Sequence, residues 1–175
     1  MEIAIFGGGC FWCTEAVFRM LRGVHSVMPG YAGGATAAPT HAQVSQGSTG
    51  HAEVIRVEFN PSVISYNDLL TVFFASHDPT TVNRQGNDVG TQYRSIILTT
   101  TPEQAECARA FIAELGEEGG NPIVTEVRPL DTFTPAEPEH QQYYERNTDQ
   151  PYCQVIIEPK VRKMQEKFKE LLNRQ

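Results

Sequence analysis

Short apolar runs alternate along this chain with longer stretches that place an apolar residue every three or four positions, a pattern typical of mixed helices and strands. Strands are predicted where β-branched and aromatic residues are enriched, at 3–6, 24–31, 53–59, 93–98 and 123–127. Helices are predicted, mostly from a period of 3.6, at 14–21, 65–77, 101–115, 135–147 and 159–172.

The order of the main elements is strand, helix, strand, strand, helix, strand. This order predicts a ferredoxin-like α+β sandwich built from split βαβ units, with the remaining helices as additions. Two stretches, 32–50 and 80–91, lack a sustained period and read as long loops, which are usually functional in a compact domain. A length of 175 residues suits one domain, so we expect a single domain over 1–175.

The composition is that of a globular protein, with 40% hydrophobic and 20% charged residues. A formal net charge of -7 argues against binding to nucleic acid. The basic residues in 160–169 alternate with acidic and apolar ones at a helical period, so we interpret them as a solvated helix face. The chain shows neither a leader sequence nor an apolar run of about 20 residues, and we therefore expect a cytoplasmic protein that does not enter a membrane.

The glycine-rich stretch Gly7-Gly8-Gly9-Cys10 joins the first predicted strand to the first predicted helix. Glycine permits a sharp turn, and the helix that follows offers free amide N–H groups and the positive end of its dipole. Both favour a thiolate, and cysteines in such places have pKa values of roughly 3.5 to 7.5. We therefore expect Cys10 to be a reactive thiol that is partly ionised near neutral pH, with the large apolar faces of Phe11 and Trp12 beside it.

The chain has four cysteines, and two of them, Cys10 and Cys13, form a Cys-x-x-Cys pair. A zinc site would need two more ligands at suitable spacing, and isolated Cys107 and Cys153 do not supply them, so we expect no metal. Cys107 lies on a predicted helix without polar neighbours, where most thiols are inert. A thioredoxin-like dithiol exchanger is an alternative, although such motifs carry small residues or proline between the cysteines rather than Phe and Trp.

The segment around Cys10 resembles the signature of the peptide methionine sulfoxide reductase A family, in which Gly-Cys-Phe-Trp follows the first strand. Four residues alone would be weak evidence, but further blocks follow in order over most of the chain. These blocks are Pro29-Gly30-Tyr31-Ala32-Gly33-Gly34, Gly50-His51-Ala52-Glu53-Val54, His77-Asp78-Pro79-Thr80, 83–95, Pro135-Ala136-Glu137 with His140-Gln141, and Tyr152-Cys153. The resemblance implies the same α+β fold and one catalytic domain over 1–175 that reduces methionine sulfoxide.

Reduction of a sulfoxide needs a soft nucleophile, a proton source for the oxygen and an apolar pocket for the methyl group. Cys10 would attack the sulfur, and Glu53 would donate the proton if burial keeps it protonated. Phe11 and Trp12 would line the methyl pocket. The products would be methionine and a sulfenic acid on Cys10.

By the resemblance, Asp88 and Tyr93 complete the polar side of the pocket. One residue departs from the family pattern, in which a tyrosine follows the Pro-Thr pair of the first long loop. Here Pro39-Thr40 is followed by His41. An imidazole can also donate a hydrogen bond, so His41 either holds the sulfoxide oxygen in place of the tyrosine or faces solvent.

A second thiol would convert the sulfenic acid to a disulfide. Cys13 is close in sequence, whereas Cys153 lies in a predicted Pro151-Tyr152-Cys153 loop that would swing in. We expect Cys13 to react first and Cys153 to act as a second relay. The resemblance implies thioredoxin, or a similar dithiol protein, as the reductant and no cofactor.

The family acts on the S epimer of methionine sulfoxide, so the resemblance implies that substrate, free or in oxidised proteins. The implied role is protein repair under oxidative stress, and we expect a monomer. Besides the thioredoxin-like exchanger, a redox-sensing or binding domain that captures methionine side chains without turnover stays open as an alternative.

Overall fold

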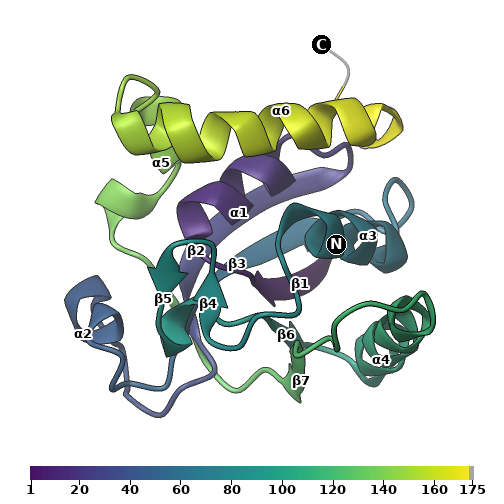
Figure 1. Cartoon of the computed structure of the whole chain (residues 1–175), viewed down its shortest axis with the longest axis horizontal. Coiled ribbons are helices and arrows are strands. Elements are labelled where there is room, and N and C mark those ends of the chain that lie inside the picture. The colour runs from purple at the N-terminus through teal and green to yellow at the C-terminus, as the bar shows by residue number, and fades with distance from the viewer. Residues whose placement is uncertain (174–175) are drawn as a thin grey trace.

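A six-stranded sheet forms the centre of the computed structural model, which describes residues 1–173 (Figure 1). Its strand order is β7-β6-β1-β3-β2-β8. The strands are β1 (Glu2–Gly7), β2 (Val24–Ala32), β3 (Ala52–Phe59), β6 (Ile96–Thr99), β7 (Glu126–Pro129) and β8 (Phe133–Pro135). A separate short hairpin consists of β4 (Arg84–Gln85) and β5 (Asp88–Val89).

The four central strands carry the predicted split βαβ topology. β3 lies between β1 and β2 and is antiparallel to both, so β1 and β2 run parallel and are joined by helix α1 (Phe11–Arg19). β6 is antiparallel to β1, and helix α3 (Tyr66–Ser76) lies between β3 and β6 in the chain. The predicted ferredoxin-like α+β fold is confirmed. At the edges, β7 runs parallel to β6 and β8 antiparallel to β2.

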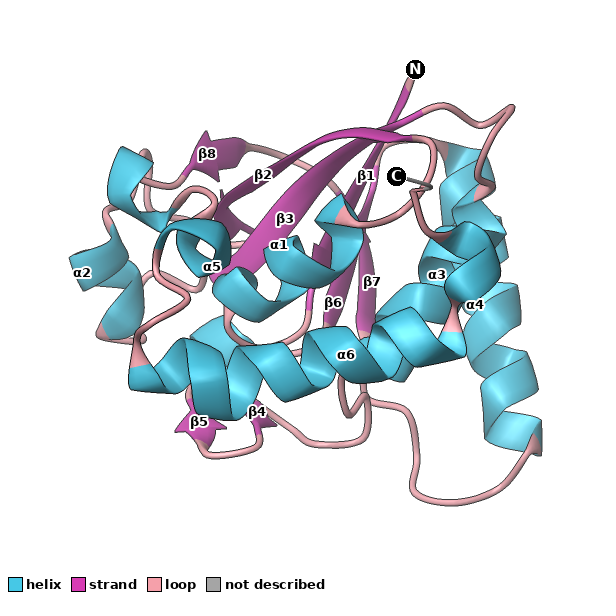
Figure 2. Cartoon of the chain, turned by 90° about the horizontal axis from the view of Figure 1, so that it is seen from above, coloured by secondary structure: helices cyan, strands magenta, loops and turns pink. Residues whose placement is uncertain are grey.

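The main core lies between one face of the sheet and the helices that cover it, α1, α3 and α6 (Glu158–Lys167), as Figure 2 shows. Aromatic side chains fill it, and the Phe6 ring on β1 stacks on Phe73 of α3 with 4.9 Å between ring centroids. Ser65 caps α3 as predicted, because its hydroxyl accepts a hydrogen bond from the backbone N–H of Asp68. A smaller apolar cluster, which includes Ile5 and Leu98, lies apart from this core. Both clusters hold β1, and therefore the start of α1, in place.

The remaining helices are α2 (His41–Ser45), α4 (Pro102–Glu117) and α5 (Tyr143–Arg146). Within residues 1–173 no helix has the length and apolar character to cross a membrane. Each predicted long loop contains ordered elements. The first includes α2, which begins with a capping box at Thr40 and Gln43, and the second includes the β4–β5 hairpin.

Three sequence predictions about local structure are wrong. The helix predicted at 135–147 is divided, because Pro135 ends β8 and Gln142 takes a left-handed conformation with φ of 53° before α5. The strand predicted at 93–98 begins only at Ile96, and Tyr93 lies in a 3₁₀ turn before it. The predicted loop around Cys153 is helical and continues through a π-helix, Cys153–Ile157, directly into α6.

Candidate active site

Cys10 occupies the N-cap position of α1, at the strand-to-helix junction that the sequence predicts. Its carbonyl oxygen accepts a hydrogen bond from the backbone N–H of Cys13 at 3.1 Å. Two glycines precede Cys10 at positions where a side chain would be strained or would clash. Gly9 has a φ of 90°, and a Cβ on Gly8 would lie 2.8 Å from a ring carbon of His77. The helix begins three residues before the predicted start, so Phe11 and Trp12 belong to its first turn.

The Glu53 carboxyl group points from β3 to the start of α1 and is only 2% exposed. Its Oε1 accepts a hydrogen bond from the backbone N–H of Phe11 at 3.1 Å. Burial raises the pKa of Glu53 to about 8, although this hydrogen bond opposes the rise. Glu53 is therefore largely protonated at neutral pH and can supply a proton beside Cys10.

The pKa values of Cys10 and Cys13 are linked through a hydrogen bond between their side chains. This bond, followed by burial and the charge of Glu53, raises the pKa of Cys10 well above its usual value. The same bond lowers the pKa of Cys13 to about 7 against the effect of burial, and the Lys160 ammonium and the Tyr152 hydroxyl lower it further. The prediction that Cys10 is the readily ionised thiol is therefore wrong for the free protein. The backbone N–H of Trp12 does favour a Cys10 thiolate, but its effect is outweighed.

The two aromatic residues after Cys10 lie in different surroundings. Phe11 is buried and packs against Tyr31, with 5.6 Å between ring centroids. Trp12 is half-buried, stacks on Tyr143 at a centroid distance of 3.7 Å, and meets Tyr152 edge-on. An apolar wall with an open side therefore stands next to the thiols, and the tyrosines that complete it come from the C-terminal part of the chain.

His41, at the start of α2, lies beside Glu53 with a third of its side chain exposed, and 3.7 Å separate its Nε2 from Glu53 Oε2. Its ring lies 4.3 Å from the ring of His140, measured between centroids. Glu137 fixes this arrangement because its carboxylate accepts hydrogen bonds from the Tyr31 hydroxyl at 2.9 Å and from the His41 backbone N–H at 3.1 Å. The structure thus places His41 at the acid group of the site.

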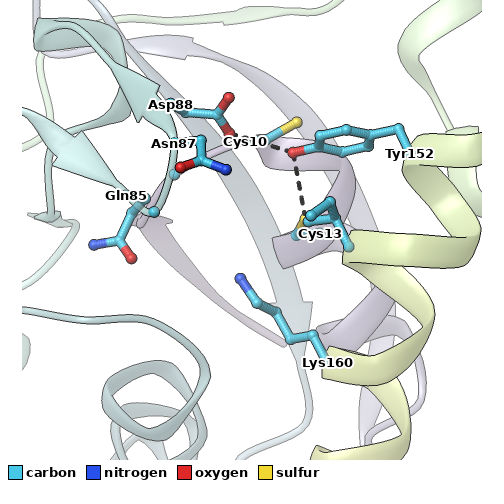
Figure 3. A pocket seen from close by; sticks show the side chains of 10 residues that line it. Cys10, Cys13, Gln85, Asn87, Asp88, Tyr152 and Lys160 are labelled. Atoms are coloured by element: carbon cyan, nitrogen blue, oxygen red, sulfur yellow. Dashed lines mark hydrogen bonds between the residues drawn. The ribbon is translucent and has the colours of Figure 1, made fainter.

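A cavity of about 350 Å³ opens on the other side of the thiols, lined by both cysteines, Asp88, Tyr152 and Lys160 among others (Figure 3). The Tyr152 hydroxyl donates a hydrogen bond to Asp88 Oδ2 at 3.3 Å and lies 4.0 Å from Cys13 Sγ.

Tyr93 is half-buried in the turn after the β4–β5 hairpin. Burial, followed by the negative charges of Glu53 and Asp88, raises the pKa of Tyr93 to about 12, so its hydroxyl keeps its proton at neutral pH. The two polar residues expected in the pocket, Asp88 and Tyr93, therefore both lie near the thiol pair.

Cys153 is fully buried in the π-helix rather than exposed in a loop. Burial, followed by the charge of Cys13, raises its pKa. All four cysteines are free thiols in this structure. Cys107 lies apart on α4, where its Sγ is 3.9 Å from the Asn67 side chain.

One group of side chains within residues 1–173 brings possible metal ligands together, namely Glu137, Glu139 and His140. Two of the three already have partners. The Glu137 oxygens accept the hydrogen bonds described above, and His140 Nδ1 accepts one from Trp12 Nε1 at 3.2 Å.

Several residues of the site were not assigned a role by the sequence. Tyr31, Glu137, His140 and Tyr152 all lie in blocks that match the family, so a signal was present, but their roles depend on contacts between distant segments. Lys160 was interpreted as part of a solvated helix face.

Two neighbouring thiols with linked pKa values, and an acid group beside them that is protonated at neutral pH, are the parts of a thiol-dependent oxidoreductase. The comparisons with known proteins identify the family. A family model described as peptide methionine sulfoxide reductase matches residues 2–172. The peptide methionine sulfoxide reductase MsrA of Acinetobacter baumannii strain AYE is 54% identical over 172 residues, which are 98% of this chain and 99% of that protein. The chain belongs to the peptide methionine sulfoxide reductase family.

Solved structures of related proteins have a similar fold. The crystal structure of Mxr1 from Saccharomyces cerevisiae in its reduced form has a TM-score of 0.80 at 33% identity, covering 87% of this chain and 88% of that chain. The crystal structure of the same yeast protein in complex with Trx2 has a TM-score of 0.56 at 26% identity, covering 81% of this chain and 84% of that chain.

The buried acid predicts a pH dependence of stability. The pKa of Glu53 is raised by folding, so its contribution to stability is fully present below the unfolded value of about 4.3 and is lost as the pH rises through about 8. Glu53→Gln has no proton to lose. The stability of the variant relative to wild type should therefore rise between pH 5 and 8, by up to about 1.4 kcal/mol per pKa unit. Urea unfolding across this range measures the difference, and a difference independent of pH would contradict the raised pKa.

Proposed function

We propose that this protein reduces the S epimer of methionine sulfoxide, free or in oxidised proteins, to methionine, with Cys10 as the nucleophile. The observation that carries the proposal is the Glu53 carboxyl group, which accepts a hydrogen bond from the backbone N–H next to Cys10 and holds its own proton at neutral pH. A nucleophile and a proton donor thus meet at one junction. The choice of the S epimer rests on the family alone.

In the first step, Cys10 attacks the sulfoxide sulfur while its proton passes to the hydrogen-bonded Cys13 thiolate. Glu53 transfers its proton to the sulfoxide oxygen. The protonated oxygen then moves to the Cys10 sulfur, and the substrate S–O bond and the transient bond between the two sulfurs both break. Methionine leaves, Cys10 becomes a sulfenic acid, and the substrate sulfur has gained the two electrons that Cys10 has lost. The raised pKa of Cys10 in the free protein is compatible with this step, because Cys13 acts as the base.

The pocket for the substrate follows from the side chains around Cys10. Phe11 and Trp12 provide the apolar wall for the methyl group, supported by the stacking of Trp12 on Tyr143. Asp88 and Tyr93 form the polar side. Tyr93 keeps its proton at neutral pH and can donate it in a hydrogen bond to the sulfoxide oxygen.

His41 takes the place of the family tyrosine at the sulfoxide oxygen. Two observations support this role. Its Nε2 is 3.7 Å from Glu53 Oε2, and its backbone is held in place by Glu137, which also accepts a hydrogen bond from the Tyr31 hydroxyl.

Regeneration requires a second thiol. Cys13 is the nearer one, and its lowered pKa provides a thiolate that attacks the Cys10 sulfenic acid and forms a disulfide with loss of water. Cys153 then acts as a relay, which requires the buried π-helix to open. Thioredoxin, or a similar dithiol protein, reduces the final disulfide. The yeast relative Mxr1 has been crystallised in complex with Trx2, which supports this class of partner.

The function is tested without any reductant. The reduced protein, mixed with methionine-S-sulfoxide, should release methionine and become about 2 Da lighter through disulfide formation. Peptide mapping should place the first disulfide between Cys10 and Cys13. Cys10→Ser should form no methionine, whereas Cys107→Ser should behave as wild type. A protein that binds the sulfoxide at unchanged mass, or an active Cys10→Ser variant, would overturn the proposal.

The acid role predicts that Glu53→Gln lowers kcat/KM by a factor of about 10² to 10⁴, because the amide keeps the shape but has no acidic proton. Wild-type activity should also fall above about pH 8, where Glu53 loses its proton, and the variant should lack this decline. Glu58→Gln, on the same strand, serves as the control and should retain activity. A loss of less than threefold in Glu53→Gln would mean that Glu53 is only structural.

The role of His41 is tested by paired variants. His41→Phe keeps the flat ring but removes the hydrogen-bond donor, so kcat/KM should fall by the equivalent of roughly 1 to 3 kcal/mol. His41→Tyr restores the donor found in the family and should recover most of the activity. Equal activity of wild type and both variants would show that His41 is a bystander.

A further inference from the structure

Lys160 comes from the first turn of α6 and reaches toward the cavity that both thiols line (Figure 3). The residue is half-buried, although the sequence placed it on a solvated helix face. Cys13 and Tyr152 line the same cavity. A cationic side chain therefore shares a confined space with the thiol that is proposed to resolve the sulfenic acid.

Among the described residues, no carboxylate oxygen lies within 4.0 Å of this ammonium group. None of the ion pairs found within residues 1–173 includes Lys160, whereas Arg162, two residues further on, pairs with Glu158 of the same helix at 2.6 Å. In a chain with a formal net charge of -7, an unpaired and half-buried cation is available to act on an anion in the cavity.

The anion that fits is the Cys13 thiolate. The other groups that face Cys13 are the Cys10 thiol on α1, the carboxyl groups of Glu53 and Asp88, the Tyr152 hydroxyl, and the Cys153 thiol. The Cys10 thiol donates a hydrogen bond to the Cys13 thiolate, the Tyr152 hydroxyl lies 4.0 Å from Cys13 Sγ, and Asp88 opposes the thiolate by its charge. Lys160 is the positively charged member of this set.

We propose that Lys160 is a positioning residue for the second step of the reaction, in which its ammonium holds Cys13 as the thiolate that attacks the Cys10 sulfenic acid. The inference rests on the proposed function, since it concerns how the sulfenic acid is resolved. It predicts that Lys160 acts only through Cys13, both where the Cys13 thiolate accepts the Cys10 proton and where it attacks the sulfenic acid.

The step is balanced within the site. Cys13, protonated during the first step, releases that proton to solvent through the open cavity and becomes a thiolate beside Lys160. The thiolate forms a bond to the Cys10 sulfur, the S–O bond of the sulfenic acid breaks, and the departing hydroxide takes up a proton to become water. The oxidation state of the Cys10 sulfur falls from that of a sulfenic acid to that of a disulfide, and the oxidation state of the Cys13 sulfur rises to the same value.

The first test needs no substrate. The rate of alkylation of Cys13 by iodoacetamide is measured by peptide mass between pH 5 and 10. Lys160→Met keeps most of the side-chain length but removes the charge, so alkylation at pH 7 should slow by about threefold to tenfold and the profile should move to higher pH. Lys160→Arg should restore the wild-type profile. Lys163→Met removes an equal charge nearly one turn further along α6 and should leave the profile unchanged.

The second test separates the two chemical steps. Reduced enzyme is mixed with methionine-S-sulfoxide and quenched at intervals, and both released methionine and the Cys10–Cys13 disulfide are quantified. In Lys160→Met, conversion of the sulfenic acid to the disulfide at pH 7 should slow by about threefold to tenfold and approach the wild-type rate near pH 10. Methionine release uses the same Cys13 thiolate as the base and should slow by no more than the same factor.

Failure of the role of Lys160 and failure of the proposed function give different results. An unchanged alkylation profile in Lys160→Met would overturn the role of Lys160, and so would a slowing that Lys160→Arg does not rescue or that Lys163→Met reproduces. If wild-type enzyme releases no methionine, the proposed function fails, but the alkylation profile still tests the effect of Lys160 on Cys13.

Discussion

The hydrogen bond from the backbone N–H of Phe11 to the buried carboxyl group of Glu53 connects the two halves of this site. It links the first turn of α1 to the central strand β3, and it satisfies one of the free amides that every helix start presents. Because Glu53 is almost fully buried, its proton is retained at neutral pH and the carboxyl group stays close to Cys10. The nucleophile, the acid and the apolar wall all depend on this one alignment of helix and strand.

Around that alignment, the site divides into two sides with opposite electrostatics. On one side, the buried Glu53 carboxyl group and the partly exposed His41 ring form a polar pair. On the other side, the cavity with Lys160 favours a thiolate on Cys13. The hydrogen bond between Cys10 and Cys13 connects the two sides, so the pKa of each thiol depends on the other.

Several contacts hold His41, the residue that differs from the family pattern, in its position. Glu137 accepts hydrogen bonds from Tyr31 and from the backbone of His41, and the ring of His140 packs beside the ring of His41. These residues come from β2, α2 and the segment after β8. The smaller ring of His41 is thereby held against Glu53, which a loop facing solvent would not achieve.

The sequence by itself determined the order of strands and helices, the thiol at the first strand-to-helix junction and the family, because periodicity, the run of glycines and the ordered motifs are local signals. It could not determine which thiol ionises, because the pKa values of Cys10 and Cys13 depend on burial and on Glu53, Tyr152 and Lys160, which lie far apart in the chain. It also placed Cys153 in a loop and Lys160 in solvent. Only the packing of the C-terminal helical segment against α1 decided that the first is buried and that the second faces the thiols.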